Sequence, residues 1–184
     1  MVELRRVGPL DGKTAEGAHP AANLRALPPA AQFMFRGTAD AAILAGNAFG
    51  AAFPRALRAT TGNNRTILWL GPDEFLLLAP ANEEAQIEAT IAASLGTTPY
   101  ALVGVSHRNT ALEISGVRAA RLLNAGCPLD LDDRAFPVAM CTRTVLAKAP
   151  IVLWRTAADA FYVSAWRSFA PYVWEFLVEA RSRL

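Results

Sequence analysis

The sequence has few of the residues on which most enzyme chemistry depends. Histidine, the side chain that most often transfers protons near neutral pH, occurs only at His19 and His107. The two cysteines, Cys127 and Cys141, form no CxxC pair and have no histidine near them, so neither a zinc site nor a disulfide framework is indicated. No GxGxxG, Walker A or GxSxG motif occurs, which leaves phosphate loops and nucleophile elbows without support.

Charge of one sign and long apolar runs are also scarce. Lys and Arg number 18 and Asp and Glu number 16, so the formal net charge is only +2, far from the basic field of a nucleic-acid binder. No run approaches the roughly 18 apolar residues of a membrane span. The opening residues, MVELRRVGPLDG, lack the apolar core of a secretory signal. We therefore expect a cytoplasmic protein that binds neither nucleic acid nor a membrane.

The apolar content, by contrast, is high. Hydrophobic residues make up 53% of the chain and the mean hydropathy is +0.22. Apolar surface in excess of one core usually ends in an interface, which predicts a permanent protein partner. An alanine-rich composition raises the same index without creating such a surface, and the sequence leaves both interpretations open.

The chain divides into an arm and one folded domain. Residues 1–31 hold three glycines and four prolines with little apolar periodicity, which predicts an extended arm, either a tether to a partner or a frayed terminus. Residues 32–184 are expected to form a single α+β domain. Its first half reads strand, helix, hairpin, helix, strand. The expected ranges are 32–36, 41–49 after a cap at Thr38 or Asp40, 65–70 with 75–78, 82–95, and 102–105.

The second half begins in the same way. Thr110, Leu112 and Ile114 share one strand face, a helix follows Ser115-Gly116, and three strands are expected over residues 141–146, 151–155 and 161–163. A last helix begins near Ser168 and carries Pro171 in its first turn. The pattern therefore predicts two imperfect ferredoxin-like, split βαβ repeats packed as one α+β domain.

Few residues stand out as candidates for chemistry. The polar run Ser106 to Asn109 lies between two apolar strands, where it can serve turn hydrogen bonding or a contact with a ligand or partner. His19 lies in the arm and is expected to be solvated. Cys127 follows a helix and Cys141 begins a strand, so both are expected to be buried and inert.

Two acidic features also have ordinary interpretations. Glu113 points to the polar face of its strand, where Arg143 or Arg155 could pair with it. Asp130, Asp132 and Asp133 form an acidic cluster without the glycine and terminal glutamate of a calcium loop, which favours a solvated loop.

Four segments resemble the gamma subunit of heterotetrameric sarcosine oxidase. The main one is SHRNTALEISGVRAARLLNAGCPLDL at Ser106 to Leu131, and the others are CTRTVL at Cys141, VLWR at Val152 and RSFAPYVWEFL at Arg167. The resemblance covers roughly Trp69 to Leu177. The family also looks like a remote relative of the folate-binding domain of aminomethyltransferases, which fits the two expected repeats. The chain lacks the Lys-Gly-Cys signature of related folate proteins.

The resemblance implies a function and a set of partners. Gamma subunits join alpha, beta and delta subunits in a complex that oxidatively demethylates sarcosine to glycine and passes the carbon to tetrahydrofolate. FAD, FMN, NAD and tetrahydrofolate are implied for the larger subunits and zinc for the delta subunit, with no cofactor in this chain. No catalytic, cofactor-binding or metal residue is carried over. We expect a subunit interface drawn from Ser106, His107, Arg108, Asn109, Arg143, Arg155, Arg167, Tyr172 and Trp174.

Two alternatives remain from different classes of function. A stand-alone folate-binding or one-carbon module would need a pocket with an acidic group and basic groups for the ligand. A self-sufficient enzyme would need converging catalytic groups, of which the sequence shows none.

Overall fold

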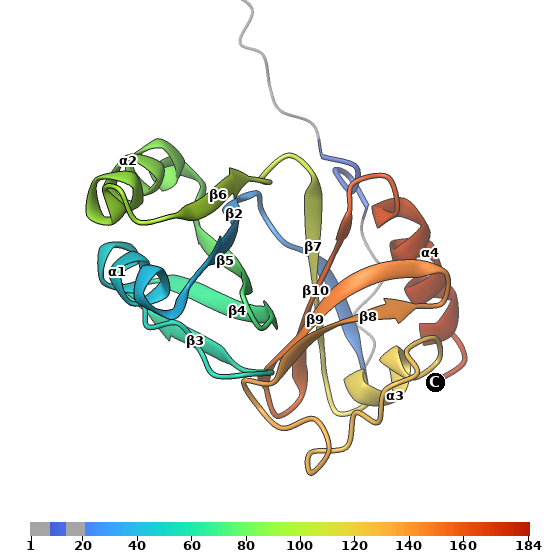
Figure 1. Ribbon diagram of the computed structural model, residues 1–184. Coiled ribbons are helices and arrows are strands. Elements are labelled where there is room, and N and C mark those ends of the chain that lie inside the picture. Colours follow the sequence, from blue (N-terminus) through green and yellow to red (C-terminus); the bar gives the residue numbers. More distant parts are fainter. Residues whose placement is uncertain (1–7, 14–20) are drawn as a thin grey trace, which may run out of the picture.

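The protein has four layers, with two β-sheets back to back and a pair of helices on each outer side (Figure 1). The computed structural model describes residues 8–13 and 21–184. Helices α1 (Ala39–Phe49) and α2 (Glu84–Leu95) cover one sheet, and α3 (Ala119–Leu123) and α4 (Ala170–Arg181) cover the other. The α+β class predicted from the sequence is confirmed. No helix in the described residues is long and apolar enough to cross a membrane.

The first sheet has the order β3-β4-β5-β2-β6, with every neighbouring pair antiparallel. Its strands are β2 (Ala30–Gly37), β3 (Ala59–Gly62), β4 (Arg65–Gly71), β5 (Glu74–Pro80) and β6 (Tyr100–Gly104). β2, β4, β5 and β6 have the order of the split βαβ unit, and β3 adds an edge strand. The predicted hairpin is confirmed as β4 and β5.

The second sheet has the order β1-β7-β10-β9-β8 and is also antiparallel throughout. Its strands are β1 (Asn23–Ala26), β7 (Asn109–Ser115), β8 (Cys141–Leu146), β9 (Ala149–Ala157) and β10 (Ala160–Trp166). Read from the other edge, the order β8-β9-β10-β7-β1 matches the first sheet position by position. The two predicted repeats are therefore confirmed, each with one extra edge strand, β3 or β8.

The structure differs from the expected N-terminal arm over residues 21–31. β1 pairs with β7 from Asn23–Ser115 to Ala26–Leu112 and occupies the place that β6 takes in the first repeat. Ala22 and Leu24 are buried in the core of the second repeat, as is Leu10 further upstream. The sequence of β1 shows little apolar periodicity, because the strand is short and its core-facing side consists of one leucine and two alanines. His19 lies outside the described residues.

Of the predicted capping residues, one is confirmed and two are wrong. Thr38 caps α1 as expected, with Oγ1 accepting a hydrogen bond from the Ala41 amide. Asn82 lies inside the short 3₁₀ turn η1 (Ala81–Glu83), so the predicted cap of α2 is wrong. The expected cap Ser168 precedes α4 by two residues and also makes no cap, whereas Pro171 lies in the first turn as predicted.

Alternation along the strands separates three layers of apolar side chains. In β2, for example, Phe33 and Phe35 face α1 and α2, while Met34 faces the other sheet. The layer between the sheets is formed by Leu68, Leu70, Leu76, Val105, Ala111, Cys141 and Tyr162. Edge strands close one side, where Arg58 and Met140 form an antiparallel bridge. The opposite side is closed by the loop between β6 and β7, which is the segment of greatest functional interest.

Candidate functional site: the loop, cavity and groove between the sheets

The Ser106–Asn109 loop crosses from the first repeat to the second and is fixed by Ser106. This serine is 3% exposed, and its hydroxyl accepts a hydrogen bond from the Gln32 amide (2.9 Å) and donates one to Glu84 Oε1 (2.6 Å). Three elements, β2, α2 and the loop, therefore meet at one hydroxyl. The hydrogen bond within the turn itself runs from the Arg108 amide to the Val105 carbonyl at 2.9 Å.

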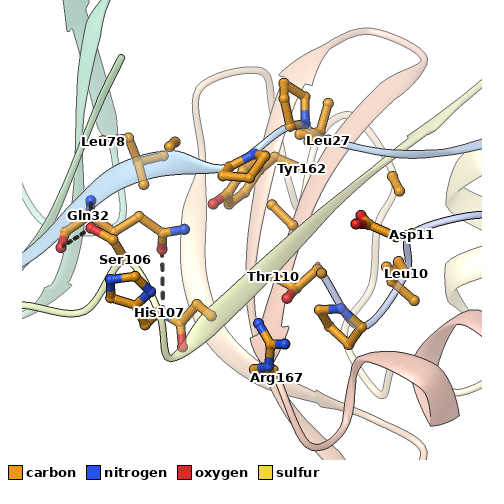
Figure 2. Close-up of a pocket in the computed structure, with 18 residues that line it drawn as sticks. Leu10, Asp11, Leu27, Gln32, Leu78, Ser106, His107, Thr110, Tyr162 and Arg167 are labelled. Carbon is orange, nitrogen blue, oxygen red and sulfur yellow. Dashed lines mark hydrogen bonds between the residues drawn. The ribbon is translucent and has the colours of Figure 1, made fainter. Parts of the chain in front are cut away.

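Asn109 extends the same polar network. Its Nδ2 donates to Gln32 Oε1 at 3.5 Å, and its Oδ1 is buried without a hydrogen-bond partner among the residues that the structure describes. Gln32 is itself 3% exposed and carries this amide into the space between the sheets. Figure 2 shows the hydrogen bonds of Gln32 at the wall of a cavity.

The cavity of about 280 Å³ is lined mainly by apolar groups. Leu10, Leu27, Leu78, several prolines and the Tyr162 ring form most of its wall (Figure 2). Of the 18 lining residues that the structure describes, Asp11, His107, Tyr162 and Arg167 have ionisable side chains. Burial raises the pKa of Tyr162 to about 12, so the phenol stays protonated.

A second hollow, of about 330 Å³, lies on the other side of Asn109, and we call it the inter-sheet groove. Its floor is apolar, with Met34, Leu70, Leu76 and Val152. One rim carries Arg108, whose guanidinium lies 6.0 Å from the centre of the Trp166 ring, and the Arg108 carbonyl accepts a 2.7 Å hydrogen bond from the Arg167 amide. The other rim carries Arg143.

Arg143 is held by Glu74, which also binds Arg36. Glu74 Oε2 accepts hydrogen bonds of 2.9 Å from both arginines, and Oε1 accepts a second one from Arg143. The hydrogen bond from Arg143, reinforced by Arg36, lowers the pKa of Glu74 to about 2 against the opposing effect of partial burial. Because the arginines come from β2 and β8, this carboxylate joins the two sheets.

Replacing Glu74 with glutamine is expected to lower the free energy of unfolding at pH 7 by about 1–2 kcal/mol, a value discounted because both arginines are half-exposed. The folded-state pKa lies below the ordinary value of 4.5, so the carboxylate stabilises the fold above that pH and loses this effect as pH falls toward 2. Urea unfolding of both proteins between pH 7 and pH 3 measures the difference, which should shrink as the pH falls. Asp73→Asn, at the exposed neighbouring position, is the control, and a pH-independent difference would contradict the assignment.

Two residues expected at an interface are buried inside the chain, which corrects that prediction. Arg155 is 4% exposed and donates to the carbonyls of Leu131, Phe136 and Ala158, which lie in the loop before β8 and the turn after β9. Trp174 is 3% exposed and packs in the core of the second repeat. Neither side chain is available to a partner.

The remaining predicted positions lie at the surface. His107, Arg108, Arg143 and Arg167 are exposed around the loop, the cavity and the groove. Tyr172 is 39% exposed on α4, where its hydroxyl accepts a hydrogen bond from the Lys148 amide at 3.4 Å, and it lines neither hollow. The structure thus gathers most of the predicted residues at one end of the sheets and leaves Tyr172 apart.

The acidic predictions had mixed outcomes. Glu113 pairs with Arg25 of β1 at 3.0 Å, so pairing with Arg143 or Arg155 was wrong, because β1 was not expected beside β7. Asp130 and Asp132 accept hydrogen bonds from backbone amides two residues on, and Asp133 pairs with Arg155. Within residues 8–13 and 21–184, no three His, Cys, Asp or Glu side chains are grouped to hold a metal ion.

Both cysteines are buried, as predicted. Cys127 is 4% exposed and Cys141 is fully buried between the sheets. Burial raises the pKa of Cys141 to about 11, which keeps it in the unreactive thiol form at neutral pH.

Sequence reasoning missed Glu74, Gln32 and the exposed position of Trp166. The alternation along β10 carried no signal for Trp166, since the strand is buried on both faces from Phe161 to Ala165 and the tryptophan is exposed because it ends the strand. Glu74 lies next to a turn, and nothing in its neighbourhood along the chain indicates two arginines from distant strands.

The comparisons with known proteins agree with each other. The family model described as sarcosine oxidase, gamma subunit, matches residues 36–183. The sarcosine oxidase subunit gamma of Corynebacterium sp. (strain P-1) is 37% identical over 137 residues, which cover 73% of this chain and 66% of that protein. That of Arthrobacter sp is 36% identical over 146 residues, covering 78% and 70%. The chain thus spans about two thirds of the length of these relatives.

Solved structures extend the comparison to the fold. A chain of heterotetrameric sarcosine oxidase from Corynebacterium sp. U-96 superposes with a TM-score of 0.87 at 31% identity, over 97% of this chain and 95% of that one. The glycine cleavage system aminomethyltransferase T from Bartonella henselae superposes with a TM-score of 0.67 at 14% identity, over 88% and 46%, which shows a shared fold alone. Together with the family match across most of its length, these similarities show that the chain belongs to the sarcosine oxidase gamma subunit family.

Proposed function

We propose that this protein is a non-catalytic subunit of a heterotetrameric sarcosine oxidase, in which it binds alpha, beta and delta subunits and supports their assembly. The observation that carries the proposal is the superposition, over nearly the whole of both chains, on a chain of heterotetrameric sarcosine oxidase. Sarcosine demethylation would then take place on the larger subunits.

The cavity supports placing the cofactors elsewhere. Its volume of about 280 Å³ lies at the lower limit of small-molecule sites, which run from about 300 to 1,000 Å³, and a flavin or a dinucleotide needs far more room. We therefore propose that FAD, FMN, NAD and tetrahydrofolate belong to the larger subunits and zinc to the delta subunit.

Co-expression tests the proposal directly. The chain, produced with the alpha, beta and delta chains of a sarcosine oxidase from the same source, is expected to co-elute with them in size-exclusion chromatography at equal stoichiometry. The chain alone, supplied with sarcosine and flavins, is expected to produce hydrogen peroxide at background rate. Failure to co-elute, or sustained turnover by the lone chain, would contradict the assignment.

A folate-binding module is the alternative. The fold shared with aminomethyltransferase T is its only support. Isothermal titration of the protein with tetrahydrofolate separates the two functions, because micromolar binding would favour the module, whereas a subunit of the proposed kind should give no heat of binding.

A further inference from the structure

One exposed surface combines cationic and aromatic groups. Arg108, at the β6–β7 loop, and Trp166 and Arg167, at the end of β10, form it together with Pro9 and Ser168, and we call it the Arg–Trp ridge. Trp166 is 48% exposed, and its ring is flanked by the Arg108 guanidinium at 6.0 Å and the Phe169 ring at 6.3 Å. Tryptophan and arginine are two of the residue types that are enriched at the energetic centres of protein interfaces.

The ridge leads directly into the inter-sheet groove. Arg108 and Trp166 line both the depression at the ridge and the inter-sheet groove, and the apolar groove floor of Met34, Leu70, Leu76 and Val152 begins behind them. The groove volume of about 330 Å³ accommodates one or two large side chains. An occupant that covers Trp166 can therefore also place an apolar side chain between the sheets.

The depression at the Arg–Trp ridge and the inter-sheet groove differ in charge. The depression at the ridge is lined by the cationic side chain of Arg108, and no carboxylate is among the lining residues that the structure describes. The one carboxylate that lines the described part of the groove belongs to Glu74, which is already held by Arg143 and Arg36. Positive potential is thus concentrated on the Trp166 side, which favours a partner surface carrying Asp or Glu.

The backbone beneath the ridge is ordered before any partner binds. Ser106 fastens the loop to Gln32 and Glu84, and the Arg167 amide bonds to the Arg108 carbonyl at 2.7 Å. A preorganised contact surface loses little conformational entropy on association, so the contacts it makes add more to affinity.

We propose that the Arg–Trp ridge and the inter-sheet groove form a docking surface for an acidic segment of a partner subunit. Its carboxylate binds Arg108, and an adjacent apolar side chain covers Trp166 and enters the groove. The inference rests on the proposed function, because the partner is one of the other subunits of that complex, and it adds the face of this chain and the chemistry of what binds there.

Competition inside one cell tests the surface. Tagged alpha subunit is co-expressed with beta and delta subunits and with equal amounts of wild-type chain and one variant, and mass spectrometry of the tag-purified complex gives the ratio of variant to wild type. Arg108→Glu and Trp166→Ala are each expected to reduce that ratio about 10- to 30-fold. Arg121→Glu reverses the charge of an exposed arginine on α3, away from the ridge and the groove, and should leave the ratio of variant to wild type near one.

Two further measurements separate the possible outcomes. The melting temperature of each purified variant must lie within a few degrees of wild type, so that lost incorporation reflects lost contact. Raising the salt concentration during assembly should reduce the advantage of wild type over Arg108→Glu and change that over Trp166→Ala much less. If wild type is recovered with tagged alpha and both ridge variants compete equally, the docking surface is wrong and the proposed function stands. If wild type itself is not recovered, both fall.

Discussion

Replacing Arg155 with methionine is expected to lower the free energy of unfolding by about 3–5 kcal/mol, because it leaves buried carbonyl groups without a donor. The guanidinium donates to Leu131 and Phe136 on one side and to Ala157 and Ala158 on the other, and it lies 5.1 Å from the centre of the Phe161 ring. For a protein of this size the change corresponds to a fall in melting temperature of about 6–20 °C.

Calorimetry and urea unfolding measure this effect, and Asp133 supplies the matched control. Its side chain is 74% exposed, so Asp133→Asn removes a solvent-screened charge partner while Arg155 keeps its hydrogen bonds to the carbonyls, and the change should cost no more than about 1 kcal/mol. Arg155→Lys should fall between the two, since one ammonium group cannot reach carbonyls on both sides. A methionine variant within about 1 kcal/mol of wild type would show that water replaces the guanidinium.

Arg155 also shows how far strand alternation can be trusted. Ile151, Leu153 and Arg155 share the face of β9 that packs on the helices, so the pattern placed the arginine on an apolar face. Its partners are carbonyls of irregular segments, which carry no sequence signal. A subunit contact was therefore predicted where the protein has an internal hydrogen-bonding centre.

The elements that could be predicted are those with local causes. Alternation and helical periodicity gave β2, the β4–β5 hairpin, α1 and α2, and the recurrence of strand-helix-strand-strand gave the two repeats. Helix α4 was predicted, but Trp174 was expected at an interface, whereas it packs beside Val173 and Leu177 in the core. A wide apolar stripe accommodates adjacent residues, which spacing by three and four does not reveal.

The candidate site could be predicted only in part, because it depends on contacts between residues that are far apart in the sequence. The loop Ser106–Asn109 could be singled out because it is a polar run between apolar strands. The contacts that shape its surroundings join Ser106 to Glu84 and Arg143 to Glu74, across 22 and 69 positions of the chain. Such pairs depend on the packing of two sheets, and a single sequence does not specify them.

The position of β1 has a topological consequence that can be tested by moving it. In the first repeat, β6 follows α2 along the chain, whereas the equivalent strand of the second repeat, β1, comes before everything else. The two ends are nevertheless close in space, since the Arg118 amide binds the Ala21 carbonyl and the Arg118 side chain binds the Leu184 carbonyl. A linker of a few residues, each spanning about 3.3–3.6 Å, can therefore join Leu184 to Ala21.

A permuted protein with residues 30–184, a short Gly-Ser linker and then residues 21–29 is expected to fold with a stability close to that of a chain of residues 21–184, which lacks the same upstream segment. A chain of residues 30–184 alone should lose at least about 3 kcal/mol, because Leu24 no longer covers the core and the edge of β7 is left unpaired. Urea unfolding of the three proteins compares them directly. If the permuted chain were as unstable as the chain without β1, the order of the elements along the chain would matter as much as their final place in the sheet. β1 and β6 would then be equivalent in their position in the sheet but not in how the chain folds.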